Sequence, residues 1–231
     1  MCSIVVAFTN LQELPATAVT KLSRSELARA GEFKSAGRQH EYLCGRALLR
    51  AVLQHLTGEP ASSHEITTSD EGKPVCTRGP AVSIAHSGDI VVCAATDQGQ
   101  IGVDVDVPRR HRDVIGIANR YFAADEVEWL SSQPADRFYM LWVLKEAWLK
   151  AKGTGIAGGL DRLRCVVTPP NIEARIKDEA VPVLSLHTIE DALIGVATTT
   201  ALQGNPAIDR WDPMSGRIEE YGNAKLIATT A

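Results

Sequence analysis

Two stretches in different halves of the chain share a pattern of short strand-like segments. Residues 83–84 followed by 91–96 resemble residues 185–186 followed by 194–199. Each stretch comes after a segment with helical periodicity, so each half is expected to form helices and then strands. The pattern predicts an α+β fold of two similar lobes, each a small antiparallel sheet packed with helices, related by a pseudo-twofold axis. A chance similarity between two amphipathic hairpins is the alternative interpretation.

The predicted lobes are joined by a link near residues 107–112. We assign residues 1–108 to an N-terminal lobe and residues 109–203 to a C-terminal lobe, with the active site expected in the cleft between them. Glycine, proline and weak periodicity after residue 203 predict an irregular C-terminal extension over residues 204–231. Helices are expected within 21–56 and 113–152, and strands over 81–86, 90–95, 101–107, 163–167, 183–187 and 193–200, the first three as an antiparallel meander.

Composition limits the classes of function. The chain has 231 residues, and its formal net charge of −4 argues against a general nucleic-acid-binding protein, which normally carries a basic stripe. Five scattered cysteines without a CxxC pair predict reduced thiols rather than a zinc site or a disulfide framework. The apolar N-terminus is short and has no basic region, and no apolar run is long enough to span a bilayer. We therefore expect a soluble, cytoplasmic protein with no membrane partner.

Two acidic residues lie on one face of a predicted strand over residues 101–106. Alternation places Gly102, Asp104 and Asp106 on one side and Ile101 and its apolar neighbours on the other. Carboxylates two residues apart on a strand are about 7 Å apart at Cα and repel each other unless a cation lies between them. A hard divalent ion suits this arrangement. The alternative is that both carboxylates are solvated on an exposed sheet face.

The segment from residue 142 to 155 predicts a helix that ends in a glycine-rich turn. Trp142, Glu146 and Lys150 recur at helical spacing and form a second stripe beside an apolar one. This surface is typical of a helix that approaches a ligand, whereas the alternative for Glu146 and Lys150 is an ordinary surface ion pair. His86 ends a predicted strand at a turn, where it either faces a cleft or is merely exposed. The chain has no GxSxG motif, so a serine hydrolase built on Ser87 is not supported.

The order of these segments resembles a known family. AHSGD at residues 85–89, GVDVD at 102–106 and WVLKEAWLKAKGTG at 142–155 are similar to the motifs of 4'-phosphopantetheinyl transferases of the surfactin-synthetase type. Residues 42–50 and 71–74 match the family more loosely, and the resemblance covers roughly residues 38–160. The resemblance implies transfer of the phosphopantetheine arm of coenzyme A to a serine of an apo acyl- or peptidyl-carrier protein, with release of 3',5'-ADP.

The resemblance also implies roles for individual residues. Glu146 is the expected base for the carrier serine, and Lys150 and His86 complete the expected catalytic set. Mg²⁺ or Mn²⁺ is expected to bridge the coenzyme A pyrophosphate, because such an ion prefers oxygen ligands. The expected metal ligands are Asp104, Asp106 and Glu146. The expected coenzyme A contacts are Arg38, Arg46, Lys73, His86, Ser87, Asp104 and Lys150.

Some positions depart from the family pattern. Ala85 and Asp106 replace a more frequent serine and glutamate, and Glu41 stands where an arginine is often found, so Arg38 or Arg46 is expected to supply that cation. Residues 120–122 form a candidate docking point for an acidic carrier protein, with a buried aromatic on a solvated helix as the alternative. The two-lobe build predicts a monomer. A metal-dependent nucleotide pyrophosphatase and a non-catalytic coenzyme A or carrier-binding module are the alternative functions.

Overall fold

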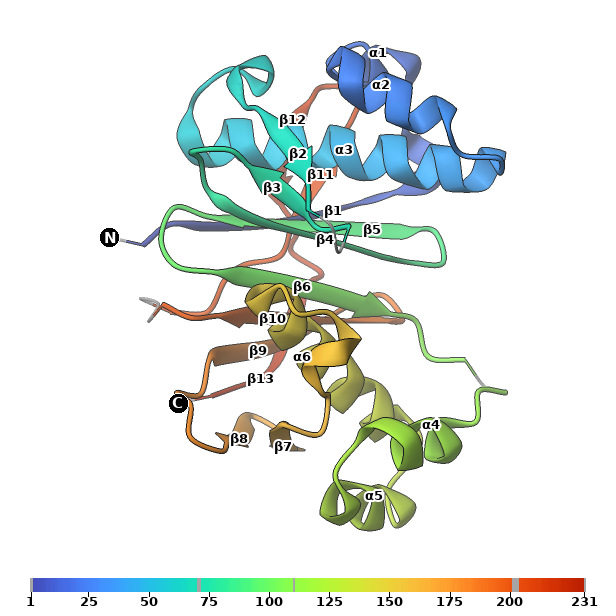
Figure 1. Ribbon diagram of the computed structural model, residues 1–231, viewed down its shortest axis with the longest axis vertical. Coiled ribbons are helices and arrows are strands. Elements are labelled where there is room, and N and C mark those ends of the chain that lie inside the picture. The colour runs from blue at the N-terminus through green and yellow to red at the C-terminus, as the bar shows by residue number, and fades with distance from the viewer. Residues whose placement is uncertain (1, 70–71, 110, 201–203, 231) are drawn as a thin grey trace.

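The computed structural model describes residues 2–69, 72–109, 111–200 and 204–230. These residues form α-helices, two main sheets and a two-stranded ribbon, which confirms the predicted mixed α+β class. The layers follow one another as helix, sheet, sheet and helix (Figure 1). Glu71, in one of the two segments that match the family loosely, and residues 201–203, at the end of the predicted C-terminal lobe, lie outside the described residues.

The first sheet is covered on its outer face by the long helix α3 (Ala36–Thr57). Its apolar residues Leu48, Leu49 and Val52 are fully buried against the sheet. The helix ends at Gly58, whose positive φ of 74° suits glycine and closes the last turn. The short helices α1 (Ala16–Val19) and α2 (Arg24–Gly31) pack against α3. In order across the sheet the strands are β12 (Arg217–Glu220), β11 (Asp209–Asp212), β1 (Ile4–Asn10), β5 (Ile90–Thr96) and β4 (Ala81–Ser87).

The second sheet carries helix α6 (Asp136–Lys152) on its outer face, and α4 (Val114–Tyr121) and α5 (Ala124–Ser131) lie near the start of α6 (Figure 1). In order its strands are β6 (Ile101–Asp106), β10 (Ala192–Thr198), β9 (Val183–Ile189), β13 (Lys225–Thr229), β8 (Asn171–Ile176) and β7 (Leu163–Thr168). The ribbon is β2 (Ile66–Thr68) with β3 (Pro74–Cys76), and single 3₁₀ turns cover Leu11–Glu13, Ala61–Ser63 and Ile156–Gly158.

The predicted three-stranded meander over residues 81–107 is wrong in its last strand. β4 and β5 form the expected hairpin, but β6 pairs with β10 and so belongs to the second sheet. Every residue of β6 is buried, and Ile101, Val103 and Val105 contribute to the core between the two sheets. The hairpin-length link before β6 did not indicate this, because a short connection is equally able to carry the chain from one sheet to the next.

The expectation of an irregular C-terminal extension is also wrong. The described residues 204–230 contain three strands, and β11 extends the first sheet by pairing in parallel with β1. β13 lies within the second sheet between β9 and β8, so the C-terminal part of the chain joins both sheets. These strands are only four or five residues long. They are stabilised by pairing with adjacent strands of the two sheets rather than by an alternating pattern of apolar residues of their own.

Candidate active site

Strand β6 and helix α6 approach each other closely, and this brings Asp104 near Glu146. The face of β6 that carries Gly102, Asp104 and Asp106 is turned toward α6, as expected from the alternation. Gly102 lies directly against the backbone of Ala147, where a Cβ atom would collide with the carbonyl oxygen. The glycine therefore allows the helix that carries Glu146 and Lys150 to rest on the strand that carries the aspartates.

Asp104 forms an ion pair with Lys150 in a largely buried position. Lys150 Nζ lies 2.7 Å from Asp104 Oδ1 and also donates to the carbonyl oxygen of Ile84 on β4 at 3.4 Å. Lys73 Nζ donates to the carbonyl oxygen of Lys150 at 2.7 Å, so the end of α6 is tied to the first sheet's side of the site. Burial raises the pKa of Asp104, Lys150 opposes this rise, and Asp106 adds to it.

Glu146 is a half-buried carboxylate one helical turn before Lys150. Burial raises its pKa to about 7, the negative charge of Asp104 contributes to the rise, and Lys150 opposes it. Two desolvated carboxylates thus share one ammonium group. The site favours the addition of either a proton or a cation, and a group with a pKa near neutrality is suited to accept a proton from a hydroxyl.

The raised pKa of Glu146 has a consequence for stability in the absence of divalent metal. Because folding raises this pKa from its ordinary value of 4.5 to about 7, the folded protein binds more protons than the unfolded chain between these values, and stability falls as pH rises through that window. Glu146→Gln does not titrate. Its advantage in unfolding free energy over the wild type should grow by about 2 kcal/mol between pH 5 and pH 8, after allowance for partial exposure.

Chemical denaturation of both proteins in a chelating buffer at the two pH values measures this difference. A difference between variant and wild type that does not change with pH would contradict the raised pKa.

Asp106 is held by two partners from different elements. Ser87 at the end of β4 donates to Oδ1 at 3.1 Å, and Arg112, before α4, lies 2.5 Å from Oδ2. Ser87, predicted to contact coenzyme A, therefore contacts the second aspartate in this structure. Its hydroxyl also accepts the backbone N–H of Val107 at 3.3 Å, which links the edges of the two sheets.

The three predicted metal ligands do not form a ready cluster. Within the described ranges, no group of three acidic, histidine or cysteine side chains is placed so that it can hold a metal ion. The reason is that Asp104 and Asp106 are each turned toward a basic side chain. The donor set nevertheless fits a hard cation, because all the ligand atoms are oxygens. The carboxylates also repel one another: the charge of Asp106 raises the pKa of Asp104, and the charge of Asp104 raises the pKa of Glu146.

A cavity of about 280 Å³ beside β4 gathers three of the predicted coenzyme A contacts. Arg38, Arg46 and His86 line it together with Glu41 and Tyr42 from α3. Arg46 is buried, and its Nη1 atom has no hydrogen-bond partner among the described residues, so a buried guanidinium donor is left for a ligand. The other nitrogen, Nη2, donates to the Thr68 hydroxyl at 2.9 Å.

Glu41, which stands where an arginine is often found, adds a negative charge to this cavity. Its carboxylate pairs with Arg38 at 2.8 Å and lies 3.9 Å from His86 Nε2. Lys73 points instead to the end of α6, as described above, although its neighbours Gly72 and Pro74 line the cavity. Arg46, with its unpartnered donor, is therefore the cation best placed to meet an anion there.

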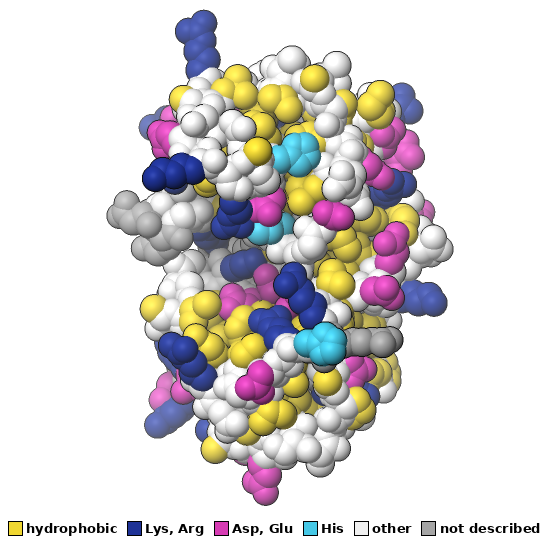
Figure 2. Space-filling model, turned by 90° about the vertical axis from the view of Figure 1, so that its right-hand side faces the viewer, with side chains coloured by type: hydrophobic (Ala, Val, Ile, Leu, Met, Phe, Trp, Pro, Cys, Tyr) yellow, Lys and Arg dark blue, Asp and Glu magenta, His cyan; other side chains and the backbone are white. Residues whose placement is uncertain are grey.

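Acidic and basic side chains meet in a hollow across the middle of one face of the molecule. Figure 2 shows acidic groups in this hollow with lysine and arginine side chains around it. Of the predicted docking residues, Arg120 is exposed, whereas Phe122 is buried and stacks on Phe138 at 5.5 Å. For Phe122, the alternative interpretation of residues 120–122, a buried aromatic side chain, is therefore correct.

Two family models match successive parts of the chain. The family model for the 4'-phosphopantetheinyl transferase N-terminal domain matches residues 28–96, and that for the 4'-phosphopantetheinyl transferase superfamily matches residues 100–196. 4'-Phosphopantetheinyl transferase HetI of Nostoc sp. is 33% identical over 170 residues, which cover 70% of each chain. The chain belongs to the 4'-phosphopantetheinyl transferase family. The predicted family is confirmed.

Other transferases of this family are similar over a smaller share of their length. The 4'-phosphopantetheinyl transferase psf-1 of Bacillus pumilus is 37% identical over 124 residues, which cover 51% of this chain and 52% of psf-1. The L-aminoadipate-semialdehyde dehydrogenase-phosphopantetheinyl transferase of Homo sapiens is 28% identical over 173 residues, which cover 68% of this chain and 56% of the human protein. The two matched family segments meet between β5 and β6, where the chain passes from the first sheet to the second.

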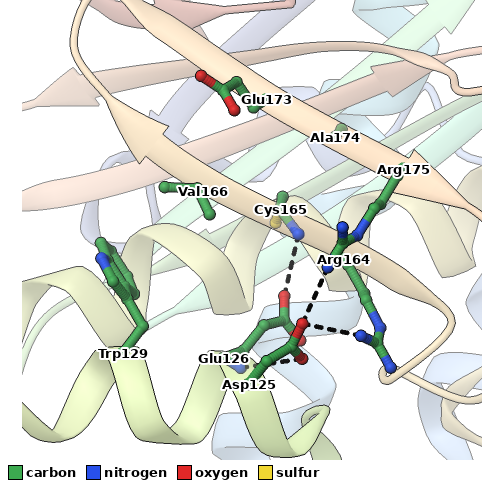
Figure 3. A pocket seen from close by; sticks show the side chains of 9 residues that line it. All are labelled: Asp125, Glu126, Trp129, Arg164, Cys165, Val166, Glu173, Ala174 and Arg175. Atoms are coloured by element: carbon green, nitrogen blue, oxygen red, sulfur yellow. Dashed lines mark hydrogen bonds and ion pairs between the residues drawn. The ribbon is translucent and has the colours of Figure 1, made fainter.

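The lysine before Glu146 in this family's helix motif has a role that the sequence did not indicate. Lys145 is completely buried on another face of α6, where Nζ donates to Glu126 Oε2 at 2.8 Å and to the carbonyl oxygens of Leu160 and Leu163. Figure 3 shows Glu126 beneath β7, where Oε1 accepts the N–H of Cys165 at 3.0 Å. Lys145 therefore fixes α6 against α5 and β7.

The cavity in Figure 3 is separate from the active-site residues. It has a volume of about 290 Å³ and lies between α5 and the hairpin of β7 and β8. Asp125 at its edge pairs with Arg164 at 2.8 Å and Arg175 at 2.9 Å, so these charges satisfy one another.

No helix in the described part of the chain has the length and apolar character needed to cross a membrane.

Proposed function

We propose that the chain transfers the 4'-phosphopantetheine arm of coenzyme A to a serine hydroxyl of an apo acyl- or peptidyl-carrier protein and releases 3',5'-ADP. The observation that carries the proposal is the contact of α6 with β6, which sets Glu146 and Lys150 against Asp104. Next to this group lies a cavity with an unpartnered buried arginine donor. Family membership supports the same activity.

Glu146 is the proposed base for the carrier serine. Its carboxylate is half-buried, has a pKa near neutrality and lies at the face of α6 next to Asp104. Lys150 is proposed to hold a phosphate oxygen as a point charge once a ligand draws it away from Asp104. His86, Arg38 and Arg46 are proposed to bind the nucleotide end of coenzyme A in the cavity beside β4.

Asp104, Glu146 and Asp106 are the proposed ligands of Mg²⁺, with Mn²⁺ as a substitute. A divalent cation bound there supplies positive charge that offsets the charge developing on the departing 3',5'-ADP. The chain's own contribution is the all-oxygen donor set and the orientation of Glu146 by α6. Lys73 and Ser87 are proposed to assist by holding the end of α6 and Asp106 in place.

We further propose that the two sheets, each with its helix, act as two lobes related by a pseudo-twofold axis. β4 and β5 form one antiparallel hairpin and β9 and β10 another, in agreement with the internal similarity of the sequence. α3 covers one sheet and α6 the other, so each half repeats the same helix-on-sheet unit. A monomer containing both halves has the proposed site at their junction.

Mass spectrometry of intact apo-carrier proteins tests the proposed function. Incubation of several acyl- and peptidyl-carriers with the protein, coenzyme A and Mg²⁺ should add one phosphopantetheine group to at least one carrier and release 3',5'-ADP in equal amount. A carrier in which the acceptor serine is changed to alanine is the control. Release of 3',5'-ADP without any carrier would instead indicate a nucleotide pyrophosphatase, and neither product would overturn the proposed activity.

A further inference from the structure

The guanidinium of Arg112 lies against Asp106, one of the proposed metal ligands. Its Nη1 atom lies 2.5 Å from Asp106 Oδ2, and the side chain is about one-quarter exposed. Ser87 donates to the other carboxylate oxygen at 3.1 Å. Both oxygens of Asp106 are thus engaged by the chain itself, and a metal ion can take Oδ2 only when the guanidinium leaves it.

We propose that Arg112 is an internal competitor of the divalent cation, holding Asp106 in the metal-free protein and yielding it when metal binds. The inference rests on the proposed function in that it takes Asp106 as a metal ligand. It explains why the three carboxylates do not form a ready cluster in this structure. It also predicts that metal affinity is set partly by a residue that is not a ligand.

Hydrogen bonds hold the backbone at Arg109 and at the start of α4, so the proposed exchange is a movement of the Arg112 side chain. On one side, the hydroxyl of Tyr139 accepts the N–H of Arg109 at 2.9 Å and donates to the carbonyl oxygen of the same residue at 3.0 Å. On the other, Asp113 caps the first turn of α4 by accepting the N–H of Gly116 at 2.8 Å.

Arg112 has a second set of contacts that remain available after it leaves Asp106. Its guanidinium carbon lies 5.2 Å from the ring centre of Trp142 and 5.6 Å from those of Phe138 and Tyr139. Cation–π attraction to these rings does not depend on the carboxylate, so it continues to stabilise the guanidinium near the rings once Asp106 is released. The side chain also borders an open hollow that it shares with Asp106, Arg109 and His111, which provides room for movement.

Metal binding by Arg112→Met tests the proposal, with Arg109→Met as the matched control. Both changes remove one positive charge from the same loop, but only Arg112 is paired with Asp106 in the described structure. Titration with Mn²⁺, followed by the electron paramagnetic resonance of the free ion, gives the dissociation constant without coenzyme A or carrier. Arg112→Met should bind Mn²⁺ about tenfold more tightly than the wild type, and Arg109→Met less than threefold more tightly.

A second pair of variants separates competition at Asp106 from a general effect of charge or folding. In an Asp106→Asn background the carboxylate is absent, so the further change Arg112→Met should leave Mn²⁺ affinity within twofold. Thermal unfolding establishes that each variant is folded before titration. Equal effects of Arg112→Met and Arg109→Met, or weaker binding by Arg112→Met, would overturn the proposal. A failure of the proposed transferase activity would show separately, as the absence of carrier modification by the wild type.

Discussion

Changing Glu146 to glutamine is expected to slow carrier modification by about three orders of magnitude or more, because one substitution removes both the proposed base and a metal ligand. Glutamine keeps the shape of the side chain and its place on α6. The measurement is the rate of mass increase of an apo-carrier at saturating coenzyme A and Mg²⁺. Since the proposed base acts on the reacting hydroxyl, the loss is expected to fall mainly on kcat rather than on KM.

Glu128→Gln is the matched control for this experiment. Glu128 is exposed on α5, and the same change there removes one negative charge without touching the site. It should leave the rate within about twofold, as expected for a surface substitution. Because Glu146→Gln is expected to be at least as stable as the wild type at pH 8, a lost rate cannot be attributed to unfolding. A rate within tenfold of the wild type would exclude Glu146 as the base.

The sequence predicted well those features that depend on local periodicity. Strand alternation correctly placed Gly102, Asp104 and Asp106 on one face, and the predicted glycine-rich turn correctly ended helix α6. The mixed fold class and the family were also confirmed. The strand face and the helix end follow from residues that are neighbours in the chain, and the family follows from motifs that are each local, so no knowledge of distant contacts was required.

Features that depend on distant contacts were missed. Nothing in residues 101–106 shows that β6 pairs with β10, which lies in the other half of the chain. β13 is stabilised between β9 and β8, and its five residues carry no clear strand pattern alone. Tyr139 on α6 binds the backbone of Arg109 near the Arg112–Asp106 ion pair, and Lys145 on α6 reaches Glu126 on α5, and neither contact is indicated by the local sequence.

Changing Gly102 to alanine is expected to destabilise the protein by about 3 kcal/mol and to lower kcat about a hundredfold. The added Cβ would collide with backbone atoms of Ala147 and Ala151, and backbone cannot rotate away as a flexible side chain can. Gly195 on β10 lies in the same way against Val143, so α6 rests on two glycine-bearing strands. To accommodate alanine the helix must move outward, and Glu146 then moves away from Asp104.

The same substitution at Gly31 controls for the intrinsic effect of replacing glycine. Gly31 is the last residue of α2, and a Cβ there would meet no atom within 4 Å. Gly31→Ala should therefore leave kcat unchanged and raise stability by up to about 1 kcal/mol, because alanine loses less backbone entropy in a helix. Chemical denaturation and carrier-modification rates measure both variants. If Gly102→Ala kept wild-type stability and rate, the close contact of β6 with α6 could not be what positions Glu146, and the proposed arrangement of the site would be wrong.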